Sequence, residues 1–125
     1  MSKLKAAPDT IISGSRAADG RLEVYVRTGE TETLLPHIVH HSPTGFEAGY
    51  GGSGPADLAL SILAFVIGDE RQTVDIYEGK TCGALAWQLH HQFKRDFVAG
   101  FEHERWAIRV GQIRQWIADQ ERIES

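Results

Sequence analysis

The stretch GFEAGYGGSGPADLAL, residues 45–60, decides the fold, because flexible backbone gives way there to an unbroken apolar segment. Five of the chain's 13 glycines fall within residues 45–54. Glycine loses more conformational freedom on folding than any other residue, so the cluster indicates positions that need a positive φ or close backbone approach. The segment therefore predicts either a ligand-binding loop or a tight structural turn.

The residues after the glycines predict a buried helix over residues 55–67. Gly54 is the predicted N-cap, Pro55 suits the first helical position, and Asp57 can reach back to the unpaired N–H groups. Apolar residues surround the whole helical cylinder instead of one stripe: Leu58, Leu60, Ile62, Leu63, Phe65, Val66 and Ile67. We therefore expect this helix at the centre of the core.

The residues before the glycines predict short strands. Residues 9–13 form a β-branched run, and residues 21–28 alternate apolar with polar side chains, which is strand periodicity. Gly29 and Glu30 separate residues 21–28 from the segment TETLLP, residues 31–36, and predict a hairpin. The run HIVHH, residues 37–41, is a further strand candidate.

The C-terminal half predicts two more helices and a short strand. A polar connection over residues 68–81 includes a candidate extended piece at residues 73–77, and a helix with one broad apolar side fits residues 83–101. A strand is expected at residues 105–110 and a closing helix at residues 111–122. The patterns together predict an α+β fold in one domain, residues 1–125, with a small antiparallel-rich sheet packed around the central buried helix and two further amphipathic helices.

Length, composition and charge narrow the classes of protein. A chain of 125 residues with 42% hydrophobic composition can bury one core, and its single cysteine, Cys82, excludes an intramolecular disulfide. No secretory signal is recognisable, and the longest apolar run, residues 58–67, is about half a membrane span. The net charge of −4 and the lack of a basic cluster argue against nucleic acid as a partner. We therefore expect a soluble cytoplasmic protein that binds neither nucleic acid nor membrane.

The glycine segment matches G-x-G-x-x-G at Gly49, Gly51 and Gly54, and a helix start can hold phosphate or carboxylate. No buried parallel strand precedes it and no lysine follows it, so it is neither a dinucleotide fingerprint nor a P-loop. An anion could still be held there by a stacking aromatic ring, a serine hydroxyl and a nearby cation. The candidate ligand-binding residues are Gly49, Tyr50, Gly51, Gly52, Ser53, Gly54, Asp57, Arg16 and His41. The alternative is a purely structural turn.

Metal and thiol chemistry are weaker hypotheses. His90 falls on the apolar side of its predicted helix and His91 on the wet side, so the pair cannot chelate one ion, and we expect no metal and no other cofactor. His90 is instead predicted to be a hydrogen-bonded core residue. Cys82 lacks an activating context and is expected to be a small packing residue or exposed and inert. Three tryptophans are expected to be core or interface anchors: Trp87, Trp106 and Trp116.

The run HHSPTGFEAGYGGSGPADLALSIL, residues 40–63, resembles a family of small bacterial, plasmid and phage proteins that is known only as a domain of unknown function. IISGSR upstream, and HQFKRDFVAGF and WAIRVGQIRQWI downstream, fall in the family's order across nearly the whole chain. The family usually carries tryptophan where this chain has Ala48. The resemblance implies that Gly14, Arg16, His41, Ser42 and residues 45–57 are signature positions. Its plasmid and phage context implies a protein that binds and blocks a host defence component.

Three functions remain open on the sequence. The first is a binding protein whose glycine segment and following helix start recognise an anionic or nucleotide-like ligand, with no catalytic residue. The second is a protein interaction module in which the glycines are structural and an exposed aromatic surface contacts a partner or another copy of the chain. The third is a nucleotide-directed hydrolase or transferase that uses His41 with Glu47 or Asp57.

Overall fold

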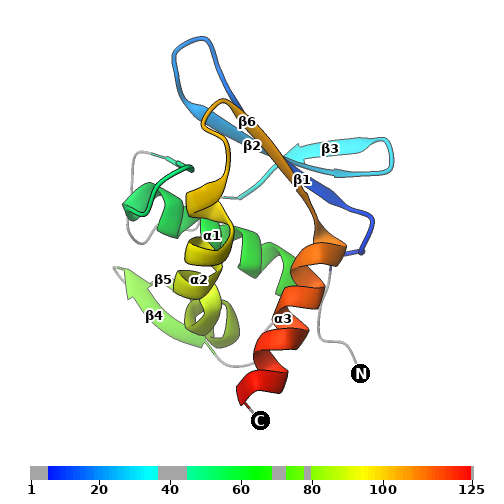
Figure 1. The fold of residues 1–125 in the computed structure, drawn as a ribbon, viewed down its shortest axis with the longest axis vertical. Coiled ribbons are helices and arrows are strands. Elements are labelled where there is room, and N and C mark those ends of the chain that lie inside the picture. The colour runs from blue at the N-terminus through cyan, green and yellow to red at the C-terminus, as the bar shows by residue number, and fades with distance from the viewer. Residues whose placement is uncertain (1–5, 37–44, 69–72, 78–79, 125) are drawn as a thin grey trace.

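The computed structural model describes residues 6–36, 45–68, 73–77 and 80–124. The chain forms a main sheet, three α-helices, a short 3₁₀ helix and a separate hairpin. Figure 1 shows the sheet above the α-helices and the hairpin beside the second of them. The elements, in chain order, are β1 (Ile11–Arg16), β2 (Leu22–Thr28), β3 (Thr31–Leu34), α1 (Ser53–Ile67), β4 (Thr73–Tyr77), β5 (Lys80–Gly83), α2 (Ala84–Asp96), the short 3₁₀ helix η1 (Val98–Gly100), β6 (Arg105–Arg109) and α3 (Val110–Glu124). The α+β class predicted from the sequence is confirmed.

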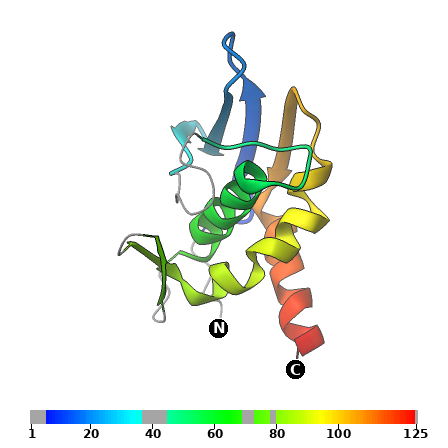
Figure 2. The same ribbon diagram turned by 90° about the vertical axis from the view of Figure 1, so that its left-hand side faces the viewer.

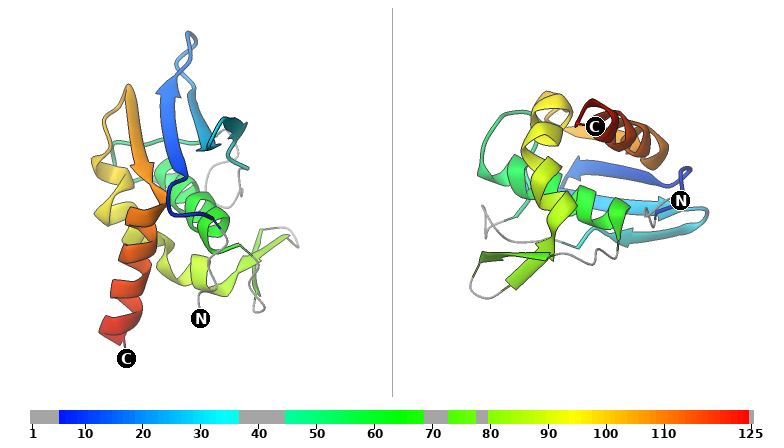
Figure 3. Two further views of the ribbon diagram at one scale, coloured as in Figure 1. Left: turned by 90° about the vertical axis from the view of Figure 1, so that its right-hand side faces the viewer. Right: turned by 90° about the horizontal axis from the view of Figure 1, so that it is seen from below.

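The main sheet is antiparallel, with the strand order β3-β2-β1-β6. Gly29, at a φ of 61°, and Glu30 form the two-residue turn between β2 and β3, so the predicted hairpin is confirmed. The alternation in β2 buries Leu22, Val24 and Val26 against the core. Figure 2 looks at this sheet from the side of α1, and the left panel of Figure 3 looks at it from the opposite side.

Helix α1 is the centre of the core, as its all-round apolar pattern predicts. Twelve of its 15 residues are buried, including Leu58, Leu60 and Ile62, which have no exposed surface. These side chains form one cluster with the inner residues of the sheet and with the buried residues of α2 and α3. None of the described helices has the length and apolar content needed to cross a bilayer.

The C-terminal elements differ from the prediction in their bounds. Helix α2 ends at Asp96 rather than near Phe101, because the chain tightens into η1 and Phe101 turns back to stack on Trp106, with ring centroids 4.3 Å apart. The extended piece at residues 73–77 is β4, which pairs with the unpredicted β5. Helix α3 begins at Val110 and its Trp116 ring packs edge-on against Phe93 of α2. The strand candidate at residues 37–41 lies outside the described residues.

Candidate functional site

The glycine segment packs closely against the chain that leads into β6. Gly49 has a φ of 90°, its N–H donates to the carbonyl of Val98 at 3.0 Å, and a Cβ there would lie 3.1 Å from the Phe101 carbonyl oxygen. Gly45 also has a positive φ, of 132°. Between them Ala48 is completely buried. At least two of the glycines therefore serve a sharply turned backbone, which only glycine adopts without strain.

Arg16, at the end of β1, ties this segment to the sheet. Its Nη1 donates to Glu47 Oε2 at 2.9 Å, and its Nη2 lies 2.7 Å from Glu47 Oε1, which is a two-pronged ion pair. Its Nε donates to the carbonyl of His103 at 2.8 Å, and Nη1 also reaches the carbonyl of Gly20 at 3.2 Å. The Arg16 side chain is only 7% exposed. The guanidinium therefore joins β1, the glycine segment and the residues before β6.

The ion pair sets the protonation of both partners. The hydrogen bond and the charge of Arg16 hold the pKa of Glu47 below its ordinary value against an opposing effect of burial. The same contact raises the pKa of Arg16 above its ordinary value. Glu47 is thus a carboxylate at neutral pH that is already paired, which makes it a poor proton acceptor. Arg16, predicted to neutralise a ligand, is already neutralised by Glu47.

The first turn of α1 differs from the prediction. Gly52 is the N-cap instead of Gly54, because the carbonyl of Gly52 already accepts from the N–H of Ala56 at 3.0 Å. Pro55 is the third helical residue, where its missing N–H is still tolerated. Gly54 is buried, and a Cβ there would lie 2.7 Å from Glu47 Cβ. The helix start is therefore braced from the side by Glu47.

Only part of the predicted ligand set is accessible. Ser53 and Gly51 are exposed, and Tyr50 is 52% exposed, with its ring lying over Gly52. Asp57 lies in α1 beyond the first turn and is completely buried. His41 lies outside the described residues. The structure also brings His103 close to Glu47, a neighbour that no local pattern in the sequence indicated.

The two glycines at the helix start are expected to differ in their tolerance of alanine. Gly54→Ala is expected to lower the free energy of unfolding by about 1–2 kcal/mol, because the added methyl must displace Glu47, and the better helix propensity of alanine offsets only part of the clash. Gly52→Ala meets only the exposed ring of Tyr50, at 2.6 Å, which can rotate into solvent. It is expected to cost less than about 0.5 kcal/mol. Urea unfolding of the two variants measures both values, and equal stability of the two would contradict the packing role of Gly54.

The remaining sequence candidates are packing residues. His90 is completely buried, with Nδ1 2.6 Å from the carbonyl oxygen of Trp87, so the predicted core histidine is confirmed. Cys82 is buried. Trp106 and Trp116 are each 8% exposed and belong to the core. Across the ranges that the structure describes, no group of three His, Cys, Asp or Glu side chains is arranged to hold a metal ion.

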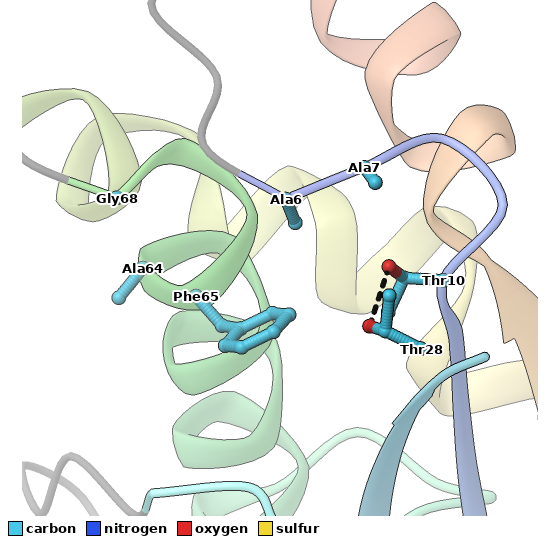
Figure 4. Close-up of a pocket in the computed structure, with 7 residues that line it drawn as sticks. All are labelled: Ala6, Ala7, Thr10, Thr28, Ala64, Phe65 and Gly68. Atoms are coloured by element: carbon cyan, nitrogen blue, oxygen red, sulfur yellow. Dashed lines mark hydrogen bonds between the residues drawn. The ribbon is translucent and has the colours of Figure 1, made fainter. Parts of the chain in front are cut away.

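A pocket of about 570 Å³ lies at the other end of α1 (Figure 4). At 1.5 Å per residue, the 15-residue helix separates it from the glycine segment by about 20 Å. Its polar feature is a hydroxyl pair, Thr10 Oγ1 and Thr28 Oγ1, 2.9 Å apart. The described residues that line it carry no charge: Ala6, Ala7, Thr10, Thr28, Ala64, Phe65 and Gly68. These residues therefore supply no cation for the anionic ligand predicted from the sequence.

A second candidate surface is the side of the main sheet that faces away from α1, here called the outer sheet face (Figure 3, left). The strand register arranges its eleven side chains in three rows. The rows are Glu32, Arg27, Ile11 and Arg109; then Leu34, Tyr25, Ser13 and Ala107; then Glu23, Ser15 and Arg105. All eleven are exposed or half-buried, and Leu34 is 63% exposed.

The charges on the outer sheet face are largely unpaired. Within the described part of the chain, Arg27, Arg105 and Arg109 form no ion pair or hydrogen bond through their side chains. Glu23 accepts a hydrogen bond of 3.3 Å from the Tyr25 hydroxyl, and its charge raises the pKa of Tyr25. The alternation RWAIR at residues 105–109 already placed two of these arginines on one side of a strand. Their nearness to Arg27 depends on the strand order, which the sequence does not display.

Of the comparisons with known proteins, the one with family models found a match. A family model matches residues 12–119, which span β1 to α3 and include the Arg16–Glu47 pair and all the outer-face residues except Ile11. No curated protein and no solved structure matches the chain. On the extent of the family match, the chain belongs to the family of unknown function DUF6166.

Proposed function

We propose that this chain is a protein-binding domain that uses its outer sheet face, and that the glycine segment is a structural brace. The observation that carries the proposal is an exposed sheet surface that holds three arginines with no ion-pair partner among the described residues and, on its β3 margin, the exposed Leu34. A surface that exposes both unpaired charge and apolar area gains from a complementary partner.

The contacts of the glycine segment support its structural role. Gly49 and Gly54 are each explained by a close approach, to Phe101 and to Glu47. The nearby guanidinium of Arg16 is used by Glu47 and two carbonyl groups. A loop in which two of the five glycines and the neighbouring cation are already engaged has less to offer a ligand than the sequence pattern indicates. The host-defence partner implied by the plasmid and phage context stays a prediction.

A second candidate function, anion binding at the start of α1, is favoured by one observation. The exposed Ser53 and the half-exposed Tyr50 flank a helix end whose N-cap, Gly52, has no side chain to cap it. An anion there would accept hydrogen bonds from the first N–H groups of the helix and the Ser53 hydroxyl. A rise in the thermal midpoint with inorganic phosphate or a nucleotide, lost in Ser53→Pro, would favour this candidate over the first.

Site-specific crosslinking tests the proposed function. A photo-crosslinking amino acid placed at Leu34 is expected to capture a protein in cells, whereas the same residue at Gln112, exposed on α3, is expected to capture much less. Adding Arg27→Glu to the Leu34 probe should reduce the captured product. Capture that is equal at the two positions, or unchanged by Arg27→Glu, would contradict the assignment of the outer sheet face.

A further inference from the structure

We propose that the partner on the outer sheet face is a second copy of this chain, with the two sheets packed face to face. The inference rests on the proposed function, because it requires that face to be a protein interface. It is carried by the distribution of charge across the strands. Arg105 and Arg109 lie on β6 at one margin of the sheet, and Glu32 lies on β3 at the other.

A two-fold axis parallel to the strands makes this distribution self-complementary. Such an axis places β6 of one copy over β3 of the other and keeps each row of side chains opposite the same row. Arg109 then faces Glu32 of the second copy, and Ala107 faces Leu34 of the second copy. Symmetry forms each contact twice. Arg109, one of the three unpaired arginines, and the exposed Leu34 thus both gain a partner.

The other face-to-face arrangement is less favourable. An axis perpendicular to the strands places β6 over β6 and exchanges the first row with the third. Arg27 then faces Glu23 of the second copy, but Arg109 faces Arg105 of the second copy, so two repulsive contacts cancel two attractive ones, whereas the axis parallel to the strands forms the attractive contacts of Arg109 with Glu32 and no like-charged contact. The charge pattern therefore selects the axis parallel to the strands.

The same pattern argues against a nucleic acid on this face. Glu23 and Glu32 lie among the three arginines, and Glu32 is the register partner of Arg27. A phosphate backbone would meet repulsion from both carboxylates, whereas a protein surface of mixed sign satisfies both kinds of charge. The chain's own net charge of −4 makes a polyanionic partner less favourable still.

The size of the outer sheet face determines how tightly two copies are expected to bind. Eleven side chains from each copy are about half of the 20–30 residues that each partner contributes to a standard interface. The apolar part of the face, formed by Leu34, Tyr25 and Ile11, is small. We therefore expect a reversible dimer with a dissociation constant in the micromolar range or weaker, so association must be measured up to about millimolar protein.

A charge swap tests the arrangement by sedimentation equilibrium of the purified full chain. Arg109→Glu and Glu32→Arg alone are each expected to weaken dimerisation about tenfold or more, because each creates two like-charged contacts. The double variant restores opposite charges and is expected to return to within about threefold of the wild type. Arg95→Glu makes the same charge change on α2, away from the face, and is expected to leave dimerisation unchanged. Thermal unfolding of every variant confirms that each is folded.

The outcomes separate this inference from the proposed function. A wild-type chain that is monomeric at the highest concentration, or a double variant no better than the single ones, would overturn the second-copy arrangement. If the Leu34 probe then captures a different protein, the proposed function stands without it. A wild-type dimer that is insensitive to both single substitutions would also overturn the arrangement, because the contact would lie elsewhere. Rescue by the double variant supports the arrangement, since repair by a second charge change requires that residues 32 and 109 meet across the interface.

Discussion

Replacing Arg16 by alanine is expected to lower the free energy of unfolding by about 2–3 kcal/mol, with a matching fall in the urea midpoint. The substitution removes a guanidinium that is 7% exposed, so the carboxylate of Glu47 and the carbonyls of Gly20 and His103 lose the hydrogen bonds that Arg16 donates. The expected loss of unfolding free energy is smaller than for a fully buried ion pair, because the Glu47 side chain is 35% exposed and is hydrated once Arg16 is removed. Arg16→Lys is expected to recover little, because an ammonium cannot bind both carboxylate oxygens and the His103 carbonyl together.

A second arginine pair provides the control. Arg21 contacts Asp19 at 2.9 Å, but both side chains are more than half exposed. Arg21→Ala is therefore expected to leave the urea midpoint nearly unchanged. If Arg16→Ala were as stable as Arg21→Ala, the bracing role of Arg16 would be wrong, and Arg16 would again be available for a ligand.

Acid provides an independent check on the same pair. Because the pKa of Glu47 is lowered in the folded chain, its contribution to stability is present above the ordinary value of 4.5 and is lost as the pH falls through the lowered pKa. The stability difference between the wild type and Arg16→Ala should therefore shrink on acidification below pH 4.5. Urea unfolding of both chains over this range measures the difference. A constant difference would show that the charge of Glu47 does not contribute.

Replacing Gly14 by alanine is expected to cost about 2–3 kcal/mol of unfolding free energy. The new methyl would lie 2.4–2.6 Å from three atoms of the Trp106 indole, which is 8% exposed and stacks on Phe101. The ring cannot move away without losing that stack and its place in the core. Gly100→Ala is the matched control, since its added Cβ meets nothing within 4 Å, and it is expected to be close to neutral.

A double-mutant cycle identifies the cause of the Gly14 effect. Trp106→Leu is itself destabilising, but it removes the atoms that the new methyl would meet. Gly14→Ala is therefore expected to cost less than about 1 kcal/mol in that background. Equal costs in the two backgrounds would mean that the loss comes from the backbone conformation at Gly14 and not from the indole.

Gly14 and Arg16 show that a family resemblance identifies important positions without identifying their role. Gly14 and Arg16 were singled out as signature positions, and Arg16 was predicted to neutralise a ligand. In the structure Gly14 makes room for an indole, and Arg16 joins three segments through Glu47, His103 and Gly20. A signature position can therefore reflect packing between distant segments as readily as it reflects a ligand.

The sequence by itself determined the elements whose signal is local. Alternation within residues 21–28 predicted β2, the Gly29–Glu30 pair predicted the hairpin, and the all-round apolar pattern predicted that α1 is buried. These signals work because strand and helix periodicity depends only on which neighbouring side chains meet the core. Local pattern also predicted His90 as a hydrogen-bonded core residue, and the structure shows its Nδ1 2.6 Å from the Trp87 carbonyl oxygen.

Tertiary structure decided whatever depends on residues distant in the chain. The Arg16–Glu47 pair spans 31 residues, and the bond from Arg16 to the His103 carbonyl spans 87. The end of α2 depends on Phe101 reaching Trp106, and the outer sheet face depends on a strand order that places β6 beside β1. A glycine cluster has the same sequence pattern whether it contacts a ligand or a neighbouring backbone. Only the tertiary structure distinguishes the two, because close approach involves two segments that are distant in the sequence.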